Sequence, residues 1–298
     1  MNDGKVIFYR IGFIAGMLLV PPPAAEAIVI RHDVLDQTYI DFGAEFSSVG
    51  RLTSNTNTGS GVLIARSWVL TAAHLKSGSS VPGTFLLGGV PYAVETFYAH
   101  PDWTGDVLDG NDLALVRLAQ PVTQTAPSAW YTGNEEVGRI GVSVGYGRTG
   151  TGLTGQISSS GTKRAGESLL ETIGTRSPFT PDLPPDDTLE YRFYDPGDPN
   201  VLPLEAMAAQ GDSGGPVFIE SDGAFLIAGI HSFLWNMNGG NLATYGDVVV
   251  STRVAAYDEW IMGVIPEPGT VALWAGAAAW LLAAGFRRRK RPLRQGND

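Results

Sequence analysis

The sequence contains no cysteine among its 298 residues, and only 17% of its residues are charged. The absence of cysteine excludes disulfide bonds, thiolate chemistry and cysteine-ligated metal sites. The folded chain must therefore be stabilised by packing and hydrogen bonds alone.

Glycine and proline are abundant, with 38 and 19 residues respectively. Between the two ends of the chain, apolar runs of four to seven residues alternate with turns rich in Gly, Asn, Ser and Pro. This pattern is typical of sandwiches and barrels, so we expect an all-β fold. The chain is long enough for one or two domains with a proper core.

The charge is acidic and unevenly distributed. The whole chain carries a formal net charge of −10. Eight of its 20 basic and four of its 30 acidic residues lie outside residues 28–265, which leaves 12 basic and 26 acidic residues, a net −14, in that central region. Such a surface repels phosphate backbones, so we expect no nucleic-acid partner.

Residues 1–27 have the form of a secretory signal peptide. Two bases, Lys5 and Arg10, precede an apolar run over residues 11–20, and Ala25 and Ala27 form a small-x-small cleavage site. Three consecutive prolines at 21–23 argue against the alternative, a buried first helix. The pattern predicts export, with cleavage after Ala27.

The opposite end predicts a membrane segment. Residues 270–286 form an apolar run that spans about 25 Å as a helix, and five consecutive bases follow at 287–291. By the positive-inside rule these bases stay cytoplasmic, which places residues 28–265 outside the inner membrane.

The string Pro-Glu-Pro at 266–268, followed by an apolar helix and an arginine cluster, resembles the PEP-CTERM sorting signal of Gram-negative bacteria. The resemblance covers residues 266–298. It implies an exosortase-like processing partner and a cell-surface or released product, and a simple membrane anchor is the alternative.

The central region predicts short strands followed by one helix. We expect that helix at residues 254–262 and read residues 148–204 as long surface loops, whose acids form either a calcium site or, more commonly, a solvated face. The expected strands are 61–65, 67–71, 93–99, 113–118, 140–145, 216–220, 225–232 and 247–252.

Three strings carry candidate chemistry. QGDSGGP at 210–216 places a serine between glycines, which lets the backbone turn tightly and present the hydroxyl group of Ser213. WVLTAAH at 68–74 delivers His74 from an apolar strand. NDLALVRL at 111–118 puts Asp112 at the start of another apolar strand, where a buried carboxylate needs a hydrogen-bond partner.

These strings, together with GSGVLI at 59–64, resemble the chymotrypsin/trypsin family of serine proteases. The order His74, Asp112, Ser213 is that of this family and differs from the order in subtilisins and α/β-hydrolases. The resemblance implies two six-stranded antiparallel Greek-key barrels, about residues 28–130 and 131–265, with a C-terminal helix. It also implies a serine endopeptidase without metal or cofactor that acts on polypeptides.

The same resemblance assigns roles to residues. Ser213 is the nucleophile, His74 the general base, Asp112 its orienting acid, and the backbone N–H groups of Gly211 and Ser213 form the oxyanion hole. Leu75 replaces a cysteine usual in the family, which removes a disulfide but no catalytic group.

An activation pair is also implied, because family members bury a new N-terminal amine against the acid that precedes the nucleophile. Cleavage after Ala27 would expose Ile28, and Asp212 precedes Ser213. Arg31 and the isoleucine before it stand where the family usually has glycines.

The implied substrate pocket contains Met207 at its base, with Ser232, Phe233 and Leu234 along one wall, and Ser232 beside Asp112. Met207 cannot pair with a basic side chain, and Leu234 narrows the pocket together with Val249. These residues predict small or medium apolar P1 side chains.

The other three histidines, His32, His100 and His231, are expected to be structural or to lie at the surface. Two alternatives to an enzyme remain at the level of sequence. They are a catalytically silent binding protein that kept the fold, and a surface-anchored structural protein.

Overall fold

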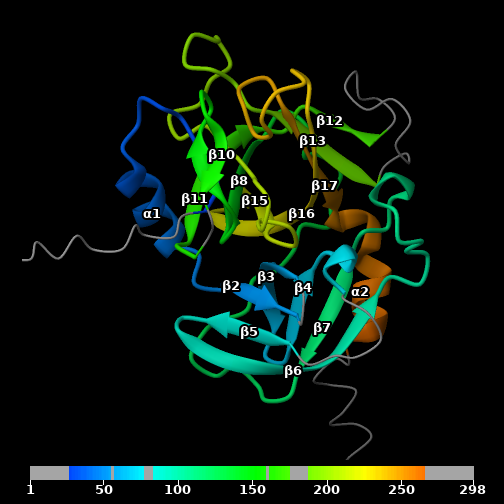
Figure 1. Ribbon diagram of the computed structural model, residues 1–298. Coiled ribbons are helices and arrows are strands. Elements are labelled where there is room, and N and C mark those ends of the chain that lie inside the picture. The colour runs from blue at the N-terminus through cyan, green and yellow to red at the C-terminus, as the bar shows by residue number, and fades with distance from the viewer. Residues whose placement is uncertain (1–26, 55–56, 77–82, 159–160, 175–186, 266–298) are drawn as a thin grey trace, which may run out of the picture.

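The computed structural model describes residues 27–54, 57–76, 83–158, 161–174 and 187–265 (Figure 1). Residues 1–26 of the predicted signal peptide (1–27), the Pro-Glu-Pro string and the predicted membrane segment lie outside the described residues. Within the described ranges, no helix is both long and apolar enough to cross a membrane.

The first half is a closed six-stranded antiparallel barrel in the order β2-β3-β4-β7-β6-β5. Its interior contains Val62, Leu70, Phe85 and Leu115, which are all buried. The strands are β2 (Val49–Thr53), β3 (Thr58–Ala65), β4 (Trp68–Thr71), β5 (Thr84–Leu87), β6 (Val90–Ala99) and β7 (Ala114–Leu118).

The second half is built on a seven-stranded sheet in the order β11-β8-β15-β16-β17-β13-β12. The expectation was six strands; the two-residue strand β12 extends the sheet at one edge, while β11 curls into contact with β13. The strands are β8 (Ile140–Gly145), β11 (Arg164–Leu169), β12 (Thr172–Ile173), β13 (Thr188–Arg192), β15 (Pro216–Ser221), β16 (Ala224–Trp235) and β17 (Val248–Arg253).

A smaller sheet, in the order β10-β9-β1-β14, joins the start of the described chain to the second half. Val29 pairs with Met207 on one side and with Gly150 on the other. The strands are β1 (Val29–Ile30), β9 (Thr149–Thr151), β10 (Gly155–Ser158) and β14 (Ala206–Met207).

The two α-helices lie on opposite halves (Figure 1). Helix α1 (Asp36–Ala44) packs on β11, where Gly43 approaches the backbone of Arg164 so closely that a Cβ would lie 2.8 Å from it. Helix α2 (Asp258–Val264), in orange, lies beside β7 of the first barrel, although it follows the last strand of the second half. The helix near the start of the described chain thus packs on the second half, and the helix at its end lies against the first barrel.

The described ranges also contain short 3₁₀ helices, among them η1 (Ala73–Leu75), η2 (Val107–Asp109) and η4 (Val254–Tyr257). The all-β expectation is confirmed, as are the eight expected strands and the closing helix, whose helical residues run two positions further than expected.

The expectation of surface loops over residues 148–204 is wrong. This stretch contributes five strands, and Leu189, Tyr191 and Phe193 are buried in the core of the second half. These strands were hard to predict because they contain charged residues, which a sequence pattern assigns to the surface but which are buried against partners in the structure. Arg164, for example, is fully buried and binds both carboxylate oxygens of Asp36 at 2.6 Å.

Candidate active site

His74 and Asp112 meet at the edge of the first barrel. His74 lies on η1, directly after β4, and Asp112 lies just before β7, which pairs with β4. The Nδ1 atom of His74 is 2.7 Å from Oδ2 of Asp112, and the backbone N–H of His74 donates to Oδ1 at 2.9 Å. Since an ionised carboxylate only accepts hydrogen bonds, this contact puts a hydrogen on Nδ1 and leaves Nε2 free to act as a base.

Asp112 is held in place by further donors. Its side chain is 1% exposed, and Ser232 on β16 donates a short hydrogen bond to its Oδ2 atom. Thr252 on β17 donates to its backbone carbonyl at 3.0 Å. A buried carboxylate with this many donors is fixed in orientation.

The loop that carries Ser213 is docked on the first barrel. The backbone N–H of Ser60 on β3 donates to the carbonyl of Ser213 at 2.8 Å. Gly214 has a φ of 78°, and a Cβ there would lie 2.9 Å from Leu75, the neighbour of His74. The serine loop and the histidine segment are therefore in direct contact, at a position where only glycine fits.

Gly211 also adopts a left-handed backbone, with a φ of 93°, and Ser60 Oγ donates to its carbonyl at 3.3 Å. The turn is closed by hydrogen bonds from the N–H of Asp212 to Ala209 and from the N–H of Gly215 to Asp212. This local geometry explains the glycine-rich string, because the chain reverses within five residues around Ser213.

Asp212 points away from Ser213 into the protein interior. It is fully buried, and the N–H groups of Gly147 and Ala209 donate to its carboxylate at 2.6 and 2.8 Å. Burial raises the pKa of Asp212 to about 7, while hydrogen bonds from the backbone N–H groups of Ala209, Gly147 and Ile28 act in the opposite direction. Ile28 is also fully buried. Its hydrogen bond to Asp212 places the two residues of the expected activation pair side by side.

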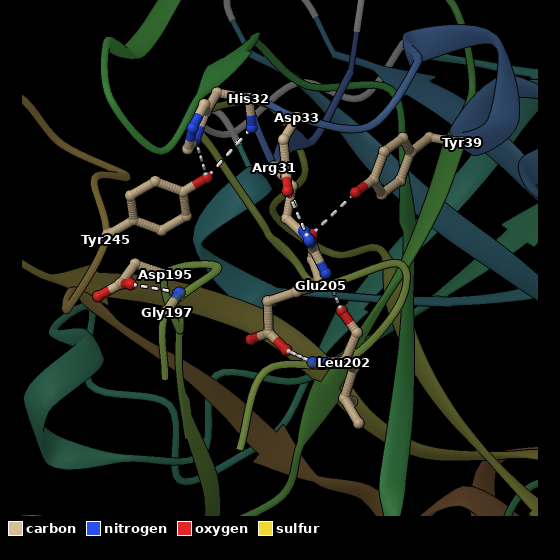
Figure 2. A network of polar contacts seen from close by, with 9 residues as sticks. All are labelled: Arg31, His32, Asp33, Tyr39, Asp195, Gly197, Leu202, Glu205 and Tyr245. Atoms are coloured by element: carbon tan, nitrogen blue, oxygen red, sulfur yellow. Dashed lines mark hydrogen bonds and ion pairs between the residues drawn. The ribbon is translucent and has the colours of Figure 1, made fainter. Parts of the chain in front are cut away.

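The segment that follows Ile28 is fixed by a polar network (Figure 2). Arg31 donates to both carboxylate oxygens of Asp33, at 2.7 and 2.9 Å, and to the carbonyl of Leu202. The Tyr245 hydroxyl accepts a hydrogen bond from the backbone N–H of His32. Tyr39 donates to the carbonyl of Glu205 at 3.1 Å. The sequence motifs did not predict this anchor.

A cavity of about 210 Å³ opens beside Ser213. Of the expected pocket residues, Ser232, Phe233, Leu234 and Val249 line it. Met207 is fully buried in the core, paired with Val29, and Ala208 takes a place in the cavity wall. The cavity is also lined by residues that were not predicted to be there from the sequence: Ala208, Ala209, Gln210, Leu242 and His231. For His231, the available signal was its position directly before Ser232 in the sequence.

The other two histidines pack or bind locally. His100 stacks edge-on against Tyr257 and Trp260, with ring centroids 5.0 Å apart in both cases, which ties α2 to the first barrel. His32 lies 2.8 Å from the Tyr245 hydroxyl.

Comparison with known proteins agrees with this architecture. The model of the trypsin family matches residues 43–172 and 197–261. Chymotrypsin-like elastase family member 1 is 32% identical in Rattus norvegicus, over 70% of this chain and 79% of that protein. The Homo sapiens relative of the same name is 30% identical over 71% and 83%. Mouse neuropsin shares the fold, with a TM-score of 0.58 and 21% identity over 74% of this chain and 95% of that one.

The closed barrel of the first half and the sheet of the second half, together with these relatives, define the class of the protein as a serine-type endopeptidase. The chain belongs to the trypsin family, and it is a hydrolase that acts on polypeptides.

Proposed function

We propose that Ser213, His74 and Asp112 cleave peptide bonds through an acyl-enzyme intermediate. Ser213 Oγ attacks the substrate carbonyl carbon while His74 Nε2 takes the hydroxyl proton. The resulting imidazolium is stabilised by Asp112 and gives the proton to the leaving amine. Water then attacks the acyl group by the same route, which releases the product acid and restores Ser213.

The backbone N–H groups of Gly211 and Ser213 are proposed to bind the oxyanion. Donors of this kind stabilise charge that develops only in the transition state, and losing one lowers kcat by about 10²–10³. The left-handed φ of Gly211 supports this role, because it turns the peptide plane before Asp212.

The observation that carries the proposal is the chain of contacts from Ser232 through Asp112 to His74, next to the docked Ser213 loop. A fluorophosphonate probe tests it. The purified protein should be labelled on one serine, and Ser213→Ala should remove both the label and peptide cleavage, lowering kcat by about 10⁶. Labelling that persists in Ser213→Ala would contradict the assignment.

We further propose that the protein is exported and activated by removal of residues 1–27. Cleavage after Ala27 would convert the Ile28 amide into an ammonium group beside the Asp212 carboxylate. The burial of both residues and the hydrogen bond from Ile28 to Asp212 support this pair. N-terminal sequencing should begin at Ile28, and a form that keeps two extra residues should be inactive.

The C-terminal proposal rests on sequence. Residues 266–298 are proposed to anchor the exported protein in the inner membrane through 270–286 until an exosortase-like enzyme removes them. Mass spectrometry of the surface or released protein should then show a chain that ends near residue 266. An intact C-terminus in that fraction would favour a simple anchor.

A further inference from the structure

One polar side chain in the wall of the cavity has no role in the chemistry of the triad. His231 lies on β16 directly before Ser232, it is 2% exposed, and it lines the same cavity as Ser213. A role for His231 in selecting the substrate side chain that enters this cavity rests on the proposed function.

The two ring nitrogens of His231 are in different surroundings. Nδ1 is 3.0 Å from the hydroxyl of Tyr191 on β13 and 3.2 Å from Oγ of Ser251 on β17. The two hydroxyls are 3.1 Å from each other, and Tyr191 also reaches Ser143 on β8 at 3.3 Å. Nε2 is buried and has no hydrogen-bond partner among the described residues.

The hydroxyl cluster can hold the tautomer that an acceptor ligand requires. When Tyr191 and Ser251 donate to Nδ1, the ring hydrogen is on Nε2. The N–H and lone-pair directions of an imidazole diverge, so Nε2 faces away from the hydroxyls of the core. A buried N–H group without an acceptor is costly, and a ligand that supplies the acceptor recovers that cost.

The rest of the cavity wall limits what that ligand can be. Ala208, Leu234, Leu242 and Val249 are apolar and match an aliphatic stem. A carboxylate at the end of the stem accepts from Nε2 and brings no donors of its own. A glutamine side chain would bring two N–H donors that need acceptors, and a leucine would leave Nε2 unsatisfied.

We propose that His231 is a specificity-determining residue whose Nε2–H binds the side-chain carboxylate of an acidic P1 residue, glutamate above all. The expectation of an apolar P1 residue rested on Leu234 and Val249 and did not include this donor. Tyr191 is a positioning residue, because it holds the ring through Nδ1.

The charges around the ring are compatible with this role. Burial lowers the pKa of His231 to about 3, so the ring is neutral in the free protein at pH 7. Burial also holds the pKa of Tyr191 above its usual range, which keeps that hydroxyl a donor. A bound carboxylate favours the imidazolium, so the site gains charge complementarity when substrate arrives.

The test uses four peptides that differ only at P1, which is Glu, Gln, Leu or Ala. The wild-type protein should show a kcat/KM for the Glu peptide about 10- to 100-fold above that for the Leu peptide. His231→Val should abolish this preference, so that the ratio of kcat/KM for the Glu peptide to that for the Leu peptide falls to about 1 or below. Tyr191→Phe should lower the same ratio.

A wild-type preference for Leu or Ala, unchanged in His231→Val, would overturn the inference while fluorophosphonate labelling of Ser213 keeps the proposed function intact. If the wild-type protein neither cleaves any of the peptides nor reacts with the fluorophosphonate, the proposed function is refuted, and the inference with it.

A binding measurement covers the case in which His231→Val does not fold. The Ser213→Ala protein, labelled with ¹⁵N on its four histidines, is titrated with an acetylated peptide that ends in Glu or in Leu. The Nε2 resonance of His231 should shift with the Glu peptide and not with the Leu peptide. Equal shifts, or none with Glu, would overturn the inference.

Discussion

At the scale of single residues, Asp112 is the most tightly constrained group in the site. It accepts hydrogen bonds from His74 and Ser232, and its own backbone carbonyl accepts one from Thr252. This arrangement fixes the histidine tautomer as well as its position. The tautomer can be tested separately from the geometry, because asparagine has the shape of aspartate but not its charge.

Asp112→Asn should lower kcat by about 10⁴, the size of the effect in the chymotrypsin-family triad, and leave KM nearly unchanged. The asparagine amide would donate to Nδ1 of His74 and so move the ring hydrogen to Nε2, where the base is needed. Peptide hydrolysis with circular dichroism as a folding check measures the effect. Asp102→Asn, at a largely exposed carboxylate, is the matched control. An Asp112→Asn variant with near wild-type kcat would contradict the role.

A second residue, Glu205, should make the free energy of unfolding depend on pH. Burial raises the pKa of Glu205 to about 8, while hydrogen bonds from the N–H groups of Leu202 and Tyr194 act in the opposite direction. The folded protein therefore binds more protons at this group than the unfolded chain between about pH 4.5 and 8, so the free energy of unfolding falls as pH rises through that window.

Glu205→Gln should make that fall shallower by up to about 1.4 kcal/mol per pH unit. Urea unfolding at several pH values, with Ser213→Ala present to prevent self-digestion, measures the slope. Glu95→Gln, at a half-exposed partner of Arg117, should leave the slope unchanged. Identical slopes in the Glu205→Gln and parent proteins would show that Glu205 titrates normally.

At the scale of elements, strand β13 shows where sequence patterns stop being informative. Leu189 and Tyr191 on the strand and Phe193 just after it are apolar at every second position, and this alternation was the available signal. The interleaved Glu190 and Arg192, and the prolines before them, made the stretch look like a solvated loop. Glu190 is nevertheless fully buried, on a strand that pairs with β12 on one side and with β17 on the other.

Leu189→Ala should lower the free energy of unfolding by about 2–5 kcal/mol, because the lost methyl groups leave a cavity in the core of the second half. Leu153→Ala is the matched control. Its side chain is 67% exposed, so we expect a change within about 0.5 kcal/mol. Chemical denaturation of both variants shows whether β13 is part of the hydrophobic core or a surface segment.

The site motifs were more predictable than the fold around them. Each of the strings at 68–74, 111–118 and 210–216 combines a reactive side chain with the local backbone that presents it. Contacts between distant segments have no such local signature. The pairing of Val29 with Met207, the docking of α1 on β11 and the hydroxyl cluster behind His231 arise only when the chain is folded.

At the scale of the whole molecule, the state of the N-terminus should control how stability depends on pH. In a chain that retains residues before Ile28, the pKa of Asp212 is raised to about 7, so stability is lost as pH rises from about 4 through 7. In a chain that begins at Ile28, an ammonium group lowers that pKa and removes the loss.

The melting temperatures of the two forms, both carrying Ser213→Ala, should therefore diverge as pH rises from 5 to 8, with the form beginning at Ile28 the more stable. Asp212→Asn in both forms should abolish the divergence. Parallel curves for the two forms with Asp212 intact would argue against the pair.

The placement of β1 has a consequence for the order of events during folding. Ile30 pairs with Thr151 and with Ala206, so the first described strand waits for partners that are made roughly 120 and 180 residues later. Contacts of such high sequence separation form slowly and late. The first described strand therefore has no partners in the nascent chain until residues 151 and 206 have been synthesised and have left the ribosome.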